Sequence, residues 1–204
     1  LQLGLAMEII VVDDGSSDDT YILAKGAGIR AVKNLRNQGK GRSLGLGLKY
    51  AQGDIIAFLD ADIGEKAAEI KKLLLPVMKG DADMAVAVFP PPTRKGGFGF
   101  VKTLAKSGVY LMTGKKVDWA LSGQRVMRRK VLQEIGPISE GFGVEVGLTI
   151  DVLRMGFKVE EVAVDMTHRE TGRDLLGIVH RTKQFINILI ALIHKAVDLR
   201  GSIP

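Results

Sequence analysis

The sequence predicts an α/β fold, with a mixed and mainly parallel sheet flanked by helices, on three observations. Short apolar runs rich in β-branched residues alternate with segments whose apolar residues recur at helical spacing. Two of these runs, residues 7–12 and 55–59, end abruptly in carboxylate pairs. The chain has 204 residues, 46% of them hydrophobic, which suffices for one domain with a substantial core.

The first half of the chain alternates strand and helix in a doubly wound order. Glycine and a Ser/Asp cluster after Asp14 predict a tight turn and the N-terminus of a helix. The run at 55–59 is too short for a helix, and Gly53 marks its start. The expected elements are a strand at 7–12, a helix to about residue 26, a strand at 29–32, a helix at 43–51, a strand at 55–59, a helix at 65–79 and a strand at 83–88.

The second half of the chain opens with a break in this order. Prolines and glycines over residues 89–97 indicate either a loop at the ligand edge or a solvated linker. Residues 117–127 combine strand propensity with a break of small residues, and Trp119 among them is expected in the core. The remaining elements expected before residue 174 are a helix at 98–112, a helix that follows Gly141 and reaches Met155, and a strand at 158–164.

The C-terminal segment has the pattern of an amphipathic helix. Apolar side chains from Leu175 to Val197 recur on one helical face. Such a helix either docks on the sheet or lies in a membrane interface, and the pattern fits both alternatives. We therefore divide the chain into one α/β domain over residues 1–173 and an amphipathic helix over residues 174–204.

Acidic residues mark the ends of the two apolar runs. Asp60 and Asp62 follow residues 55–59, and ligands of open α/β sheets bind beyond the carboxyl ends of the strands. A turn at Asp62 brings both carboxylates near one cation such as Mg²⁺ or Mn²⁺; the plainer alternative is that they end a strand and cap a helix. Asp13 and Asp14 end the first run, where an acid can hydrogen-bond a nucleobase or a ribose.

Three further residues are placed where they can meet an anionic or hydroxyl-bearing ligand. Lys40 lies between two glycines at a helix start, where its ammonium can approach a phosphate, although a flexible cap explains the motif equally well. Arg169 follows the last strand with a guanidinium suited to phosphate recognition. Glu145 lies in the first turn of a helix, which suits both the helix dipole and an acceptor site.

Composition narrows the classes of partner and location. The absence of cysteine excludes disulfides and thiolate metal sites. The net charge of +6 is concentrated in residues 91–204, which hold 18 Lys+Arg against 11 Asp+Glu. Aromatic residues make up only 5% and no nucleic-acid-binding motif is present, so phosphorylated small molecules or a lipid surface are favoured over nucleic acid. Without a visible signal peptide or membrane-spanning run, we expect a cytoplasmic location, with peripheral contact at the inner face of the membrane.

Taken in order, these motifs resemble the GT-A nucleotide-sugar glycosyltransferases of family 2, and most closely the dolichol-phosphate-mannose-synthase-like branch. The resemblance covers nearly the whole chain and rests on Val11–Ser16, Asn37–Gly41, Phe58–Asp62, Ser122–Arg125 and His168-Arg169. It implies a GT-A fold that binds a UDP- or GDP-sugar together with Mg²⁺ or Mn²⁺. By motif match it assigns the base or ribose to Asp13 and Asp14, the ribose or metal to Asp60, the metal to Asp62, a diphosphate or acceptor phosphate to Lys40, Arg125 and Arg169, and the acceptor side to Glu145.

The chain also departs from that family pattern. The family has one more strand before the first apolar run, Gly64 stands where a glutamine often assists the metal, and Gln124 replaces an aromatic residue. No paired transmembrane helices follow, although a polyprenyl phosphate remains one expected acceptor beside a hydroxyl-bearing one. Two alternatives to sugar transfer stay open, namely nucleotidyl transfer and a non-catalytic sugar-nucleotide sensor or membrane-associated partner module.

Overall fold

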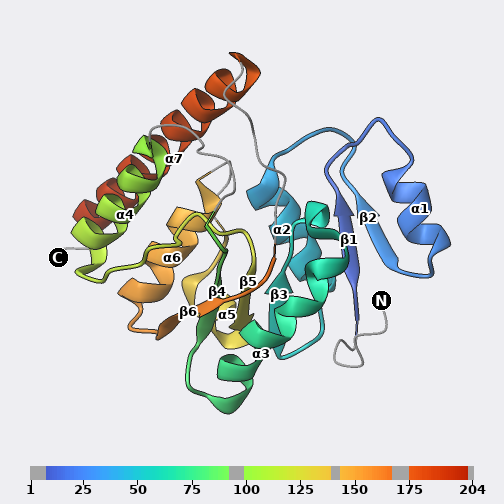
Figure 1. Cartoon of the computed structure of the whole chain (residues 1–204), viewed down its shortest axis with the longest axis horizontal. Coiled ribbons are helices and arrows are strands. Elements are labelled where there is room, and N and C mark those ends of the chain that lie inside the picture. Colours follow the sequence, from blue (N-terminus) through green and yellow to red (C-terminus); the bar gives the residue numbers. More distant parts are fainter. Residues whose placement is uncertain (1–7, 92–98, 139–142, 167–174, 202–204) are drawn as a thin grey trace.

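The computed structural model describes residues 8–91, 99–138, 143–166 and 175–201 (Figure 1). Its elements in chain order are β1 (Ile10–Asp13), α1 (Thr20–Gly26), β2 (Arg30–Lys33), α2 (Lys40–Tyr50), β3 (Ile55–Phe58), the 3₁₀ helix η1 (Ala61–Glu69), α3 (Ile70–Lys79), β4 (Met84–Val88), α4 (Phe100–Thr113), β5 (Arg125–Arg128), α5 (Arg129–Ile135), α6 (Val144–Arg154), β6 (Val159–Ala163) and α7 (Leu175–Gly201). The predicted α/β architecture with a C-terminal helix is confirmed.

One predicted helix is divided in two. The apolar spacing over residues 65–79 predicts a single helix, whereas the structure has η1 followed by α3. Gly64 lies inside η1 with φ 57° and ψ −139°, a conformation that side-chain-bearing residues rarely adopt. The chain after Asp60 therefore turns tightly before the regular helix begins, and Asp62 lies in that turn.

The strands form two sheets. β1 and β2 pair in parallel, while the second sheet has the order β3-β5-β4-β6 (Figure 1). β5 runs antiparallel to both of its neighbours, and β4 and β6 are parallel. The expected mixture of pairings is present, but β5 was hidden in the sequence within the irregular segment 117–127. Its place in the centre of the sheet depends on non-local pairing with β3 and β4.

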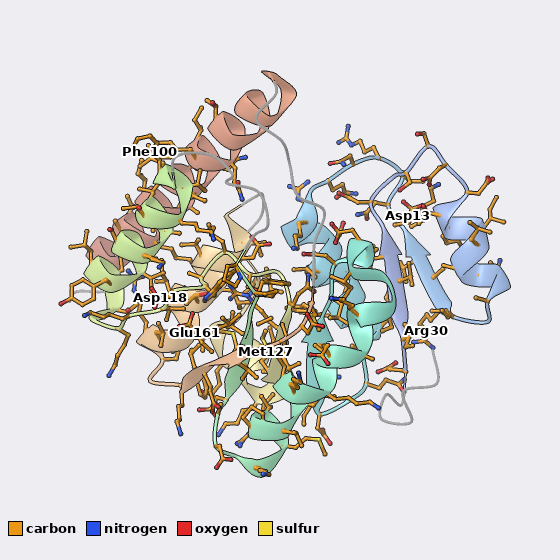
Figure 2. The ribbon with its side chains drawn as sticks, viewed as in Figure 1. Asp13, Arg30, Phe100, Asp118, Met127 and Glu161 are labelled. Carbon is orange, nitrogen blue, oxygen red and sulfur yellow. The ribbon has the colours of Figure 1, made fainter. Side chains whose placement is uncertain are left out.

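The core of the second sheet follows the alternation of side chains along β4. Ala85 and Ala87 pack toward α3, whose buried residues include Leu73 and Val77. Met84 and Val86 point to the opposite face, where residues of β5, α5 and α6 complete a second cluster. Met127 of β5 belongs to that cluster and is fully buried near the centre of the molecule (Figure 2). Both faces of this sheet are therefore covered.

A third cluster joins α4, α6 and α7, which lie together at one edge of the molecule (Figure 1). Ile188 and Leu192 are the buried residues that α7 contributes. Gly108 lets α4 and α7 approach closely, because a Cβ there would lie 2.5 Å from the Leu192 side chain. The C-terminal helix thus docks on helices α4 and α6 rather than on the sheet. Trp119 packs against the first two clusters, as expected for a core residue.

Candidate active site

The register of two antiparallel strands brings Asp60 next to Gln124. Phe58 at the end of β3 pairs with Arg125 at the start of β5, so the residues just beyond them are neighbours. The Asp60 backbone N–H donates to Gln124 Oε1 at 2.9 Å, and Gln124 Nε2 donates to Asp60 Oδ2 at 2.9 Å. Gln124 is 1% exposed. The residue that departs from the family pattern therefore fixes the orientation of the first central carboxylate.

Lys40 connects three elements at this end of the sheet. It is the first residue of α2, and its Nζ lies 2.6 Å from Asp60 Oδ1 and 2.8 Å from Glu145 Oε1. Burial of the ammonium lowers its pKa, but the charges of Glu145 and Asp60 outweigh that effect and raise the pKa of Lys40 above its usual value. Three of the predicted site residues, Lys40, Asp60 and Glu145, thus form one cluster.

Gly123 makes room for this cluster. A Cβ at that position would lie 2.3 Å from Asp60 Oδ2 and 2.6 Å from Lys40 Nζ, distances that real side chains do not adopt. Any side chain here would therefore displace the two charged groups. Glycine at this position lets the ends of the Asp60 and Lys40 side chains meet here, with no need for an unusual backbone conformation.

Arg125 lies beneath the cluster, which corrects the expectation that it contacts a phosphate directly. It is 1% exposed, and its guanidinium donates to the carbonyls of Ser122 and Ala120 and to Thr149 Oγ1. Burial lowers its pKa to about 10, against the opposing charges of Glu145 and Asp60, so it stays charged at neutral pH. Thr149 donates in turn to the Glu145 carbonyl at 2.8 Å. Through Thr149, Arg125 therefore stabilises the first turn of α6.

Asp14 holds the loop that precedes Lys40. Its carboxylate accepts the backbone N–H groups of Gln38 and Gly39 at 2.9 and 2.8 Å and the side-chain amide of Asn34 at 2.8 Å. Burial raises its pKa, but these hydrogen bonds prevail and lower the pKa below its usual value. Asp14 thereby ties the end of β1 to the N-terminus of α2, and its contacts are structural ones.

Asp13 is also engaged within the protein. It is 2% exposed; Oδ1 accepts the Ser16 backbone N–H at 2.7 Å, and Oδ2 lies 3.3 Å from Lys33 Nζ. The hydrogen bond from Ser16 is the main reason that its pKa lies below the usual value. Asp13 is thus buried at the end of β1 (Figure 2), and its contact with a base or ribose stays a prediction.

Asp62, the second central carboxylate, lies beyond the end of β3. It is exposed in the first turn of η1, and it makes no hydrogen bond or ion pair with the described residues. Within the described ranges, no group of three or more His, Cys, Asp and Glu side chains is arranged to hold a metal by itself. Mg²⁺ is commonly held by one or two carboxylates together with substrate phosphates, and a free Asp62 beside Asp60 fits that kind of site. Arg169, the last predicted residue, lies outside the described residues.

Sequence reasoning missed three contributors to the site. For Gln124 and Gly123, the sequence indicated only that they precede Arg125 in the same motif. Their contacts could not be predicted, because they depend on the register between β3 and β5. Asn34, 8% exposed, donates to Asp14 and to Ser43 Oγ, and it follows a strand without any flanking motif. A buried polar residue immediately after a short strand was the one signal available for it.

Comparisons with known proteins agree with this geometry. The model of the family described as glycosyl transferase family 2 matches residues 2–136. Glucosyl-3-phosphoglycerate synthase of Mycobacterium tuberculosis is 30% identical over 202 residues, covering 87% of this chain and 62% of that protein. Polyprenol monophosphomannose synthase of Mycolicibacterium smegmatis is 29% identical over 183 residues, covering 81% of this chain and 69% of that protein. The chain thus spans 62% of the length of the first of these relatives.

Solved structures show the same fold. A crystal structure of the Mycobacterium tuberculosis synthase with phosphoglyceric acid has a TM-score of 0.76 at 27% identity, covering 94% of this chain and 69% of that one. Another crystal structure of that synthase, with Mn²⁺, UDP-glucose and phosphoglyceric acid, has a TM-score of 0.76 at 26% identity, with the same coverage. The similarity therefore includes the region of the described cluster as well as the family domain.

Proposed function

The chain belongs to glycosyl transferase family 2, and from that premise we propose that it transfers a sugar from a UDP-sugar to an acceptor that carries a phosphate, with Mg²⁺ or Mn²⁺. The observation that carries the proposal is the Lys40 ammonium between Asp60 and Glu145, with the exposed carboxylate of Asp62 two residues after Asp60. The similar synthase from Mycobacterium tuberculosis has been crystallised with Mn²⁺, UDP-glucose and phosphoglyceric acid, which supports UDP over GDP in the donor.

Each residue of the cluster has a proposed role. Asp62, with Asp60, holds the cation, which when bound neutralises charge on the departing nucleoside diphosphate. Lys40 presents its ammonium to a phosphate, and the helix N-terminus behind it adds backbone N–H groups. Arg169 stays proposed as a phosphate ligand. Asp14 is a positioning residue, because the hydrogen bonds that it accepts from Gln38 and Gly39 set the position of Lys40.

Glu145 is the proposed general base for an acceptor hydroxyl. Its side chain is 14% exposed and lies in the first turn of α6, within reach of the same space as Lys40. A hydroxyl must lose a proton as it attacks the sugar, whereas a phosphate oxygen is already a nucleophile at neutral pH. Buried Arg125 supports this role as a positioning residue through Thr149 and the Glu145 carbonyl. Transfer to a hydroxyl therefore needs Glu145, whereas transfer to a phosphate oxygen does not.

The test compares two acceptors with one donor. The full chain is incubated with UDP-glucose and Mn²⁺, with either 3-phosphoglycerate or a polyprenyl phosphate, and the release of UDP is measured. We expect Glu145→Gln to lower transfer to a hydroxyl by about 10²–10⁴-fold and to spare transfer to a lipid phosphate. Release of glucose 1-phosphate, with the uridylyl group transferred to the acceptor, instead of UDP would indicate nucleotidyl transfer. Binding of UDP-glucose without turnover on any acceptor would identify a sensor.

A lipid-linked acceptor would place the site near a membrane, and a cytoplasmic location at the inner face of the membrane stays part of this proposal. No helix in the described part of the chain is both long and apolar enough to cross a bilayer. Polyprenol monophosphomannose synthase, at 29% identity, supports the lipid arm of the acceptor test.

A further inference from the structure

Helix α7 has a second apolar face that the described residues leave exposed. Ile188 and Leu192 pack inward against α4 and α6. Five large apolar residues recur at helical spacing on the opposite side, each between 41% and 60% exposed: Ile186, Leu189, Ile190, Ile193 and Val197. Isolated exposed apolar residues are normal in proteins, whereas a continuous stripe over three turns marks an interaction surface.

Helix α4 extends this surface. It packs beside α7 at the outer edge of the molecule (Figure 1). Leu111 is 81% exposed and Tyr110 is half exposed near its end, and Phe100 is exposed at its beginning (Figure 2). We define the α4–α7 face as these three residues together with the α7 stripe. Aromatic and aliphatic side chains are thus combined on one edge.

Lysines surround the α4 side of this face. Residues 100–118 contain Lys102, Lys106, Lys115 and Lys116, all exposed, against the single acid Asp118. Asp118 neutralises one of them, because its carboxylate lies 2.6 Å from Lys106 Nζ (Figure 2 shows Asp118 beside α4). A hollow of about 420 Å³ between α4 and the following loop has two lysines, Lys106 and Lys116, and one carboxylate, Asp118, in its lining. The rim of the apolar face is therefore cationic and has room for an anionic group.

We propose that the α4–α7 face binds the surface of an anionic lipid bilayer, with the apolar stripe in the headgroup region and the lysines on lipid phosphates. A long helix with an apolar face and flanking cations is typical of interfacial binding. A twofold pairing of the same face would instead bring the lysine rims of two copies together, and their like charges would repel. This inference rests on the membrane location included in the proposed function and names the surface that makes the contact, and it uses no residue of the Lys40 cluster.

Vesicle binding of the full chain tests this surface. Sedimentation with phosphatidylcholine vesicles is compared with vesicles that contain 30% phosphatidylglycerol. We expect binding to the anionic vesicles that weakens as salt rises, because salt screens the lysines. Ile193→Glu should lower the partition coefficient on the order of ten-fold, and Lys116→Gln by about five-fold. Leu23→Glu is the matched control, since Leu23 is 70% exposed on α1 at the opposite edge of the molecule (Figure 1). This variant should bind vesicles as the unmodified chain does.

Other outcomes overturn the proposal. Equal binding of the Ile193→Glu and Leu23→Glu variants would show that the α4–α7 face is not the contact. Ile186→Glu provides a second variant in case Ile193→Glu fails to fold, as judged by its circular dichroism. A dimer in sedimentation equilibrium that Ile193→Glu dissociates, without vesicle binding, would assign the face to a second copy. Because vesicle binding needs no turnover, its failure is separate from a failure of the proposed sugar transfer.

Discussion

Gln124 and Asp60 hold each other through two hydrogen bonds that run in opposite directions. The Asp60 backbone N–H donates to the Gln124 carboxamide oxygen, and the Gln124 amide donates to Asp60 Oδ2, both at 2.9 Å. The Lys40 ammonium donates a hydrogen bond to the other carboxylate oxygen of Asp60. The Asp60 side chain is therefore fixed from two sides, while Asp62, two residues later, makes no hydrogen bond or ion pair with the described residues.

Replacing Gln124 should loosen the site and destabilise the fold. In Gln124→Leu both hydrogen bonds to Asp60 are lost, so we expect the free energy of unfolding to fall by about 1–3 kcal/mol and UDP-sugar binding to weaken. Urea denaturation and calorimetry measure the two effects. Gln124→Glu keeps the size and the acceptor oxygen but adds a negative charge beside Asp60, and it should weaken binding as well. Unchanged binding in both variants would show that Asp60 needs no support from Gln124.

Gly123→Ala should disrupt the charged cluster. The added Cβ would lie 2.3 Å from Asp60 Oδ2, so Asp60 and Lys40 must move apart. We expect UDP-sugar binding and activity to fall even if the fold persists. The control is Gly45→Ala in α2, where no neighbouring atom lies within 4 Å of the added Cβ. That control should instead stabilise the protein by roughly 0.5–1 kcal/mol, because alanine favours a helix over glycine.

The Lys40 ion pairs should make stability depend on alkaline pH. The neighbouring carboxylates raise the pKa of Lys40 in the folded state above the value of about 10.4 in the unfolded chain. The stabilisation is therefore fully present below the unfolded pKa and is lost as pH rises through the higher folded pKa. Urea unfolding between pH 8 and pH 12 measures this loss. Lys40→Met should remove the dependence, whereas Lys49→Met, at an exposed lysine at the end of α2, should retain it.

Asp14 should stabilise the folded state at neutral pH, and this contribution should be lost in acid. Its hydrogen bonds from Gln38, Asn34 and Gly39 lower its pKa in the folded state. The contribution is present above the unfolded pKa of about 3.9 and is lost as pH falls through the lower folded pKa. Asp14→Asn should unfold more easily at neutral pH and show a smaller loss in acid. Asp54→Asn, at an exposed acid before β3, serves as the control, and an equal effect of both variants would contradict the role of Asp14.

Local patterns predicted most elements of the fold. The runs that end at Asp13 and Phe58 and the spacing over α3, α4 and α6 depend on residues close in sequence, so their periodicity is visible. Strand propensity was visible over residues 117–127, but the bounds and central place of β5 were not, because they depend on antiparallel pairing with β3 and β4. Gly64 has a left-handed backbone conformation inside η1, before α3 begins, and the apolar spacing of the segment does not show it.

The sequence predicted which residues form the candidate site better than it predicted what each of them does. Lys40, Asp60 and Glu145 were expected near an anionic ligand, and the structure brings them together. Arg125 was expected at a phosphate, yet its strand register buries it and its donors meet Ser122, Ala120 and Thr149. Asp13 and Asp14 were expected to bind a base or ribose, and in the structure Asp13 accepts from the Ser16 N–H while Asp14 accepts from the N–H groups of Gln38 and Gly39. Such roles depend on which donors the tertiary structure places nearby.

The central claim is that Asp62 holds a divalent cation that a bound sugar nucleotide shares. Isothermal titration of UDP-glucose into the full chain, with Mn²⁺ and with EDTA, compares the unmodified protein with Asp62→Asn. We expect Mn²⁺ to tighten binding to the unmodified protein, and we expect this increment to disappear in Asp62→Asn at unchanged thermal stability. An equal Mn²⁺ increment in both proteins would contradict the claim.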